Sequence, residues 1–157
     1  MQHVESHEDV RAAYLAHRRE LIQFANALVG PDEAEDAVSD AMESLLRSGA
    51  VTTADNHRAL MYRAVLNRGR SRQRSLLSRR ARERRFAQTL LSLPPDVQPE
   101  VIEAVIRLSV QQRACIFLTY WEDLSPEQIA QRLGVSNGTV KKYLARARAR
   151  LREVLDE

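Results

Sequence analysis

A polar segment in the middle of the chain has the composition of an anion-binding surface. Positions 67–75 contain no apolar side chain, and arginine occupies every second position from Arg68 to Arg74. Arginine is suited to phosphate because its planar fork of N–H groups donates two parallel hydrogen bonds. If the segment is helical, arginines four residues apart lie side by side and repel each other in water. The same arrangement favours binding of a phosphate group, which neutralises that repulsion. A solvated arm, or an arginine bias of the codons, is the alternative explanation.

A second candidate site lies near the C-terminus, where seven positions match a helix-turn-helix motif. When Pro126 is the first of twenty positions, Ala130 is the fifth and Gly134 the ninth. A small fifth residue lets two helices cross closely, and glycine at the ninth supplies the positive φ of the turn. The apolar positions that seal the helix pair are Ile129, Leu133, Val135, Val140 and Tyr143. A purely structural helical hairpin is the alternative.

The second helix of this motif carries side chains that are able to read DNA. Val140, Tyr143, Leu144 and Ala147 are predicted to face inward, which leaves the other face for a partner. The N-terminal half of such a helix enters the major groove, and arginines farther along are better placed for phosphate. A solvated face is the alternative for those arginines. The candidate DNA-binding residues are Ser136, Asn137, Thr139, Lys141, Lys142, Arg146 and Arg148, with Arg150 and Arg152 beyond them.

The charges of the chain are segregated along the sequence. The net charge is +3, with 24 basic and 21 acidic residues. Residues 1–57 carry −7, residues 58–85 carry +10, residues 86–131 carry −4 and residues 132–157 carry +4. Two basic blocks separated by acidic ones indicate two distinct anion-binding surfaces.

Helical periodicity accounts for most of the elements that would position these sites. Apolar stripes predict helices over 8–29 and 32–47, and a third that starts near residues 55–56. Four more are predicted over 100–108, 110–121, 126–133 and 137–154, and no alternating strand pattern is convincing. We therefore expect an all-α fold of two small helical domains. The expected boundaries are 1–86 for the first domain, 87–98 for a linker and 99–157 for the second domain.

The motifs together resemble a known family. The stretches 124–130, 133–141 and 145–151 (LSPEQIA, LGVSNGTVK and ARARARL) are similar to region 4 of bacterial sigma factors. The stretches 33–41 (EAEDAVSDA) and 58–67 (RALMYRAVLN) resemble region 2. The short chain resembles the extracytoplasmic-function (ECF) group, which keeps only these two regions, and the similarity covers about residues 10–86 and 98–153.

The resemblance implies a sigma factor that directs core RNA polymerase to promoters and initiates transcription. Region 4 would bind the −35 element through the helix-turn-helix, while region 2 would bind and open the −10 element. The expected partners are promoter DNA, the β′ clamp helices and β flap of core polymerase, and an anti-sigma factor. The positions matching the family's −10 contacts are Asn67, Arg68, Arg70, Arg72 and Arg74. The positions matching its polymerase contacts are Glu33, Glu35, Asp36, Asp40, Leu45 and Leu46. The alternative for the acidic residues among them is that they only complement the dipole at the start of a helix.

The sequence departs from the family pattern within region 2. Tyr62 is the only aromatic residue near a position where family members often have tryptophan. Gly69 stands where a helix-forming residue is usual, and Met42 where a bulky aromatic is common. These departures concern the details of opening the −10 element.

Several classes of protein are not indicated by the sequence. A single cysteine rules out a disulfide framework, and no signal peptide or apolar run long enough to span a membrane occurs, so we expect a cytoplasmic protein. No catalytic motif or metal-ligand set is present, so we expect no enzyme, cofactor or metal. Cys115 is predicted to lie in the core, and Tyr120 and Trp121 to pack against the protein. Two alternatives to a sigma factor remain: a stand-alone regulator with a LuxR-like output helix, and a sigma-like protein that binds polymerase or an anti-sigma factor without initiating.

Overall fold

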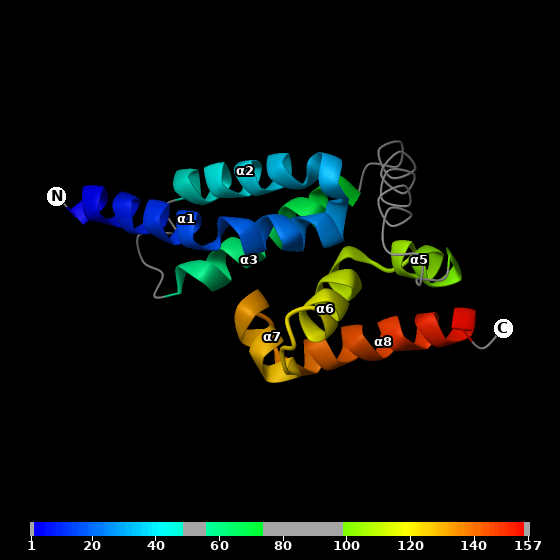
Figure 1. The fold of residues 1–157 in the computed structure, drawn as a ribbon. Coiled ribbons are helices and arrows are strands. Elements are labelled where there is room, and N and C mark those ends of the chain that lie inside the picture. The colour runs from blue at the N-terminus through cyan, green and yellow to red at the C-terminus, as the bar shows by residue number, and fades with distance from the viewer. Residues whose placement is uncertain (1, 49–55, 74–98, 156–157) are drawn as a thin grey trace.

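The computed structural model describes residues 2–48, 56–73 and 99–155, and this part of the chain forms seven α-helices without a strand. The all-α prediction is confirmed, and a helix is present wherever the periodicity predicts one (Figure 1). The helices are α1 (Gln2–Val29), α2 (Pro31–Ser48), α3 (His57–Gln73), α5 (Pro99–Ile106), α6 (Val110–Tyr120), α7 (Pro126–Leu133) and α8 (Asn137–Leu155).

Helices α1, α2 and α3 pack against one another and form the N-terminal module. The sharp turn between α1 and α2 depends on Gly30, which has φ 87° and donates its N–H to the Asn26 carbonyl at 3.0 Å. Pro31 then starts α2, where a missing N–H costs nothing, and Asp32 and Glu33 complement the helix dipole in the first turn. The interior of the module contains Leu21, Phe24, Val38, Tyr62 and Val65, all fully buried or nearly so.

Helix α3 extends beyond the end of its apolar pattern. It begins after Asn56, whose Oδ1 accepts the N–H of Ala59 at 3.1 Å, as expected for an N-cap. Leu66 is the last large buried side chain among the described side chains of this helix, yet the helix continues to Gln73 through the arginine-rich segment. Arginine and glutamine are good helix formers, so helix propensity continues where hydrophobic periodicity stops.

Helices α5–α8 form the C-terminal module, and capping boxes define the starts of two of its helices. Ser109 accepts the N–H of Gln112 at 3.2 Å, while the Gln112 side chain accepts the N–H of Ser109 at 3.1 Å. Ser125 and Gln128 make the same pair of bonds at the start of α7, at 3.2 and 2.9 Å. Both are capping boxes, and the second is the one predicted from Ser125-Pro126-Glu127-Gln128.

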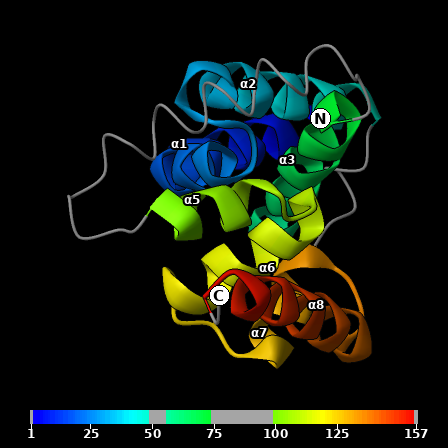
Figure 2. The same cartoon turned by 90° about the vertical axis from the view of Figure 1, so that its right-hand side faces the viewer.

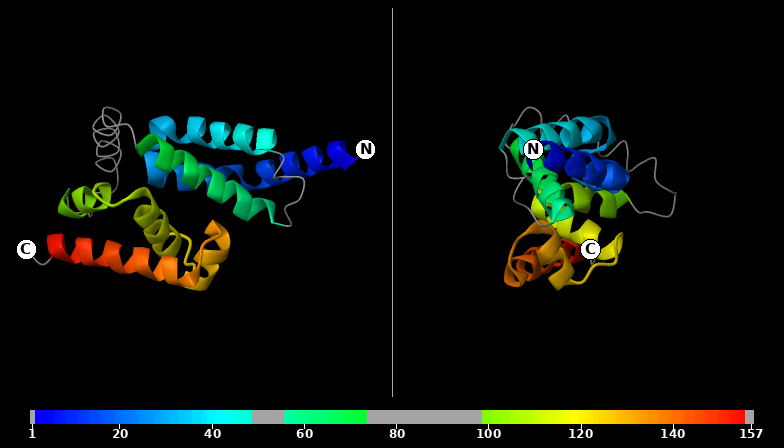
Figure 3. Two further views of the ribbon diagram at one scale, coloured as in Figure 1. Left: turned by 180° about the vertical axis from the view of Figure 1, so that it is seen from behind. Right: turned by 90° about the vertical axis from the view of Figure 1, so that its left-hand side faces the viewer.

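The two modules lie directly against each other, an arrangement that the sequence left open. Helices α1 and α3 contact α6, and α3 also contacts α7, so one hydrophobic cluster runs through both modules. Phe24 of α1 and Phe117 of α6 meet across this boundary with ring centroids 6.1 Å apart. Figure 2 shows the two modules stacked, and Figure 3 shows the N- and C-terminal ends of the described chain at opposite ends of the long axis.

Candidate nucleic-acid interface

The helix-turn-helix has the geometry that its sequence predicts. Gly134 has φ 67° and ψ 37°, the left-handed conformation of the turn, and donates its N–H to the Ala130 carbonyl. Ile129, Leu133 and Val140 are buried where the two helices cross. The motif therefore holds the start of α8 in a defined position relative to α7.

The predicted inward and outward faces of α8 are also observed. Val140, Leu144 and Ala147 are buried and Tyr143 is half-buried, as predicted. The side chains available to a partner near the start of the helix are exposed: Asn137, Lys141, Lys142 and, farther along, Arg146. Asn137 and the two lysines can hydrogen-bond base edges, whereas Arg146 lies farther from the helix start and suits phosphate.

Two of the predicted DNA-binding residues, Ser136 just before α8 and Thr139 within it, are used in capping the helix. The Ser136 Oγ accepts the N–H of Thr139 at 3.1 Å and lies 2.8 Å from the Thr139 hydroxyl. Together these contacts satisfy a helix-start N–H that would otherwise need water or a ligand. Ser136 is exposed and Thr139 half-buried, so each presents a hydroxyl edge to a partner while the cap is intact.

Two arginines of α8 are held by the rest of the C-terminal module. The Arg148 Nε donates to the Tyr120 hydroxyl at 3.4 Å, and an Arg150 terminal nitrogen donates to the Arg107 carbonyl at 2.8 Å. These bonds limit the positions that the two guanidinium groups can take, while Arg150 remains exposed and Arg148 half-buried.

The basic segment of α3 presents a second charged surface. Asn67, Arg68 and Arg70 are exposed, whereas Gly69 between them is buried. One Arg68 terminal nitrogen lies 3.1 Å from a carboxylate oxygen of Asp40 on α2. Arg72 lies within α3, but its side chain falls outside the described residues, as does the whole of Arg74.

The acidic residues of α2 lie on an accessible face, with one exception among the predicted contacts. Glu35 and Asp36 are exposed, and Glu33 and Asp40 are half-buried. Leu46 is 44% exposed, but Leu45 is only 7% exposed and packs in the core between α1, α2 and α3. The prediction that Leu45 contacts polymerase disagrees with this fold, because the apolar stripe of α2 turns that position inward.

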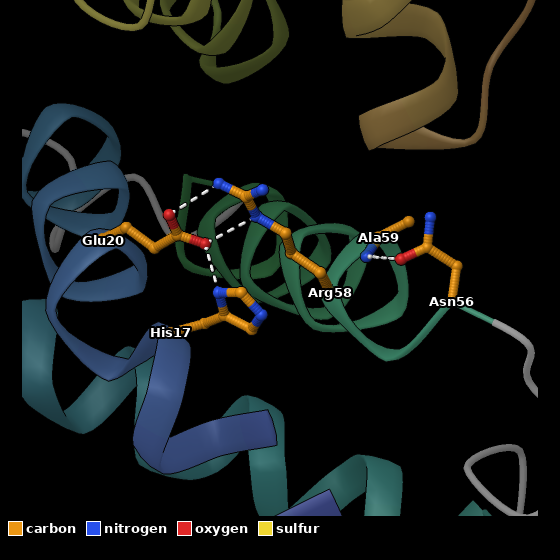
Figure 4. A network of polar contacts seen from close by, with 5 residues as sticks. All are labelled: His17, Glu20, Asn56, Arg58 and Ala59. Atoms are coloured by element: carbon orange, nitrogen blue, oxygen red, sulfur yellow. Dashed lines mark hydrogen bonds and ion pairs between the residues drawn. The ribbon is translucent and has the colours of Figure 1, made fainter. Parts of the chain in front are cut away.

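A network of charges that the sequence did not indicate ties α1 to α3. Arg58 donates from Nε and a terminal nitrogen to the two carboxylate oxygens of Glu20, both at 2.7 Å, and His17 Nδ1 lies 2.8 Å from Glu20 (Figure 4). The hydrogen bond to Glu20 raises the pKa of Arg58 above its ordinary value, with burial opposing it. Glu20 and Arg58 are 38 residues apart, so neither periodicity nor motif spacing could have paired them.

Tyr62 and Arg132 form a further contact between the modules. Tyr62 is fully buried, its ring centroid lies 4.9 Å from that of Phe24, and the Arg132 guanidinium of α7 lies 4.9 Å from the Tyr62 ring. Burial raises the pKa of Tyr62 to about 12. The single aromatic residue noted near the expected tryptophan position is thus part of the core.

The aromatic pair at the end of α6 is more exposed than predicted. Tyr120 is 60% and Trp121 is 70% exposed, although the Trp121 ring stacks on Phe117 with centroids 6.1 Å apart. Trp121 is the C-cap residue directly after α6, at the end of the helix. Cys115, by contrast, is buried in the core as predicted.

This geometry defines a class of protein: an all-α DNA-binding protein with an exposed recognition helix on a capped helix-turn-helix. The family described as "Sigma-70, region 4" matches residues 99–151, which is the C-terminal module. No described helix is long and apolar enough to cross a membrane, and the described residues contain no cluster of potential metal ligands.

Known proteins similar to this chain extend the match to the N-terminal module. The ECF RNA polymerase sigma factor SigM of Mycobacterium tuberculosis is 31% identical over 143 residues, which cover 88% of this chain and 73% of that protein. SigL of the same species is 30% identical over 164 residues, covering 94% of this chain and 89% of SigL. A sigma-E factor of Streptomyces antibioticus is 46% identical over 56 residues, but this match spans only 31% of that protein's length.

A solved structure supports the same relationship. The sigma factor RpoE, in complex with the anti-sigma factor NepR from Bartonella quintana, superposes with a TM-score of 0.61 at 26% identity. The superposition covers 95% of this chain and 98% of RpoE, so it includes both modules. The chain belongs to the ECF RNA polymerase sigma factor family, as its resemblance to regions 2 and 4 predicts.

Proposed function

We propose that the chain directs core RNA polymerase to promoters and initiates transcription there. The observation that carries this proposal is that a fold of the sigma factor family presents three charged surfaces, each with a sign opposite to that of its proposed partner. They are the exposed start of α8, the exposed arginines of α3 and the acidic face of α2. In this proposal the chain works with polymerase in the cytoplasm and has no catalytic reaction of its own.

The domain division follows from the same assignment. Residues 1–86 would serve core polymerase and the −10 element, residues 87–98 would link the modules, and residues 99–157 would serve the −35 element. Residues 74–98 lie outside the described residues, so the boundary rests on the sequence and on the region 4 match that begins at residue 99.

For the −35 element, we assign base contacts to Asn137, Lys141 and Lys142 at the exposed start of α8. The amide of Asn137 can bond adenine bidentately, and the lysines can donate to guanine. The hydroxyls of Ser136 and Thr139 would supply shorter-range contacts while capping the helix. Arg146 and Arg148 would bind the flanking phosphates.

For the −10 element, we assign Asn67, Arg68, Arg70, Arg72 and Arg74 along α3 and just beyond it. Arg68 is paired with Asp40 in the free chain, so binding a phosphate would exchange one anionic partner for another. This exchange would also release Asp40, which belongs to the proposed polymerase surface.

For core polymerase, we assign Glu33, Glu35, Asp36, Asp40 and Leu46 on α2. The acids would meet a basic surface of the β′ clamp helices, and the exposed Leu46 would add an apolar contact. Leu45 is left out of this surface because its burial in the core makes it a support for α2. The β flap and an anti-sigma factor are further proposed partners, the latter because RpoE was solved with one.

Run-off transcription with bacterial core polymerase tests the proposal directly. We expect a promoter-specific transcript that depends on this chain, and co-purified polymerase whose bound promoters can be sequenced. The double variant Arg70→Ala/Arg74→Ala should lower the transcript by at least about tenfold while polymerase still co-purifies, because it removes phosphate contacts only. Arg11→Ala, an exposed arginine of α1, serves as the matched control.

The two alternatives predict different results in the same assay. A stand-alone regulator would not retain polymerase, so Glu35→Lys/Asp36→Lys would make no difference to the amount of polymerase that co-purifies. A sigma-like protein that does not initiate would retain polymerase but yield no transcript at any promoter. For the proposed sigma factor, Glu35→Lys/Asp36→Lys should abolish polymerase retention. The control Glu8→Lys, at an exposed position of α1, should leave polymerase retention unchanged.

A further inference from the structure

Tyr120, at the end of α6, places a polar group beside the recognition helix. Its side chain is 60% exposed, and its hydroxyl lies 3.4 Å from Nε of Arg148 on α8. Helix α6 packs against α8 (Figure 1), so the phenol reaches α8 from an element outside the helix-turn-helix. The two side chains form one polar surface, which we call the Tyr120–Arg148 pair.

The backbone around Tyr120 gives its side chain a fixed base. The N–H of Trp121 donates to the Phe117 carbonyl at 2.8 Å and closes the end of α6. The N–H of Leu124 donates to the carbonyl of the buried Leu118 at 3.0 Å and holds the turn that follows. A tyrosine on such a base has only its own side-chain torsions to order, so a ligand can be bound at a low cost in conformational entropy.

Arg148 lies on the same stripe of α8 as two of the proposed base contacts. Asn137, Lys141 and Arg148 are separated by four and then seven residues, which is about one and two turns of helix. Arg148 is therefore about 16 Å along the helix from Asn137. The major groove is about 12 Å wide, so a residue this far from the helix start lies beyond the base edges, at the level of the sugar-phosphate backbone.

The hydrogen-bonding groups of the Tyr120–Arg148 pair match a phosphate group. Arg148 donates from Nε to the phenol, and within the described chain its two terminal nitrogens make no hydrogen bond or ion pair. The Tyr120 oxygen accepts that bond, so its own O–H remains available as a donor. A distance of 3.4 Å is long for an N–H···O bond, so the phenol restricts the guanidinium to one side of α8 and still lets it turn to a ligand.

The charges around the pair also favour an anion. Positions 137–152 of α8 contain six basic residues and no acidic residue. The acidic residues nearest to Tyr120 in the sequence are Glu122 and Asp123, so the basic charges outnumber them. An arginine fork and a hydroxyl within one basic surface are the donors that DNA-binding proteins use for the phosphate backbone.

We propose that Tyr120 and Arg148 form a clamp on one DNA phosphate that flanks the −35 element. In this clamp the Tyr120 hydroxyl donates to the phosphate and positions the Arg148 guanidinium for a second contact. The inference rests on the −35 role proposed above for α8, and it adds to that surface a residue from outside the helix-turn-helix. Because contacts to phosphate carry no sequence information, the clamp should act on any duplex that α8 binds.

Tyrosine nitration tests the clamp on the free, full-length chain. The probe is a mixed-sequence DNA duplex at low ionic strength, where phosphate contacts are strongest. Tetranitromethane modifies accessible tyrosines, and mass spectrometry reports each site separately. The duplex should slow nitration of Tyr120 several-fold, while Tyr14 on α1, which is half-buried, should react equally with and without DNA. An unprotected Tyr120 in a chain saturated with the duplex would overturn the proposal.

Substitutions separate the two donors by the salt dependence of binding. Tyr120→Phe keeps the ring and should weaken duplex binding about three- to tenfold, with an unchanged salt slope because the lost hydroxyl is neutral. Arg148→Ala should weaken binding and also reduce the slope of log K against log salt by about one. Arg148→Lys should keep the slope but lose affinity, since lysine has no fork and no Nε. The matched controls Tyr14→Phe and Arg18→Ala on α1 should bind like the wild type.

A double variant tests whether Tyr120 acts through Arg148. Tyr120→Phe/Arg148→Ala should weaken binding by less than the product of the two single effects, because the tyrosine then has no guanidinium to position. Single effects that multiply in full would show that the positioning role is wrong. Tyr120→Phe that binds the duplex as tightly as the wild type would show that the whole clamp is wrong.

A purely structural role for Tyr120 gives a different pattern. In that case Tyr120→Phe would lower the urea midpoint of unfolding and leave both duplex affinity and the nitration footprint unchanged, which would overturn the clamp. The clamp predicts the opposite, an unchanged midpoint with weaker binding.

Run-off transcription separates failure of the clamp from failure of the proposed function. A promoter-specific transcript together with an unprotected Tyr120 would sink the clamp and leave the sigma factor assignment intact. A protected Tyr120 without a transcript at any promoter would support the clamp as a DNA contact and contradict the proposed function.

Discussion

At the residue scale, Tyr62 combines two roles that its sequence position did not reveal. Its ring packs on Phe24 in the N-terminal core and supports Arg132 from the C-terminal module. Its hydroxyl is fully buried and has no hydrogen-bond partner among the described residues. A buried phenol in such surroundings resists ionisation, which is the physical reason that its pKa is raised to about 12.

This raised pKa predicts a specific loss of stability in alkali. Below pH 10 Tyr62 is neutral in the folded and unfolded chain, so it adds no pH dependence. Between pH 10 and about 12 the unfolded chain ionises first, and the free energy of unfolding should fall by up to about 2 kcal/mol as pH rises. Urea titrations across this range should show the fall in the wild type.

Tyr62→Phe removes the ionisable hydroxyl and keeps the ring. Its free energy of unfolding at pH 7 should stay within about 1 kcal/mol of the wild type, and its alkaline decline should be shallower. Tyr120→Phe, at a tyrosine that is 60% exposed, should keep the full decline. Equal declines in the wild type and Tyr62→Phe would assign the loss to other groups.

At the element scale, the geometry of the helix-turn-helix depends on local features that can be recognised in the sequence. The capping box at Ser125 starts α7, and Gly134 ends it in the left-handed conformation. Both features depend on contacts within a few residues, so they can be predicted from the sequence without knowledge of the rest of the fold. The start of α8 is likewise capped locally, by Ser136.

Loss of the Ser125 cap should therefore loosen the DNA-reading motif. Ser125→Ala leaves the N–H of Gln128 without its side-chain acceptor and should cost about 1 kcal/mol of unfolding free energy. Chemical denaturation followed by circular dichroism measures this loss. Ser44→Ala, at an exposed position inside α2, should cost nothing measurable because alanine is the better helix former there.

At the scale of the whole molecule, the shared hydrophobic cluster couples the two modules. Val110, Leu118 and Ile129 of the C-terminal module belong to the same cluster as Phe24 and Tyr62. Modules that bury apolar surface against each other unfold together, whereas modules joined only by a linker unfold separately.

The wild type should therefore unfold in one transition. Calorimetry should give a single peak whose calorimetric and van't Hoff enthalpies agree. A Cβ at Gly69 would lie 3.2 Å from Cγ1 of Val110 on α6, so Gly69→Leu should force the modules apart and give two peaks or a broadened one. Gly138→Ala should keep the single peak, because a Cβ there meets nothing nearer than 3.9 Å. Two separate transitions in the wild type would mean that the cluster does not couple the modules.

The sequence alone determined the features that depend on short spacings. The helices, the capping box, the turn glycine and the inward face of α8 all follow from periodicity and local chemistry, and the structure confirms them. The exposed arginines of α3 and acids of α2 stay predictions of function, though both are accessible in the fold. One local prediction disagrees with the structure, because Leu45 lies on the buried stripe of α2.

Only the tertiary structure decided what depends on residues far apart in the chain. The pairing of Glu20 with Arg58, the place of Tyr62 under Arg132 and the approach of Val110 to Gly69 carry no signal in spacing. The packing of the two modules against each other also has no signal in the sequence, since the length of the linker permits both a packed and a separated arrangement. The physical reason is that local propensity acts within a few residues, while these contacts follow from which surfaces can be buried together once the helices exist.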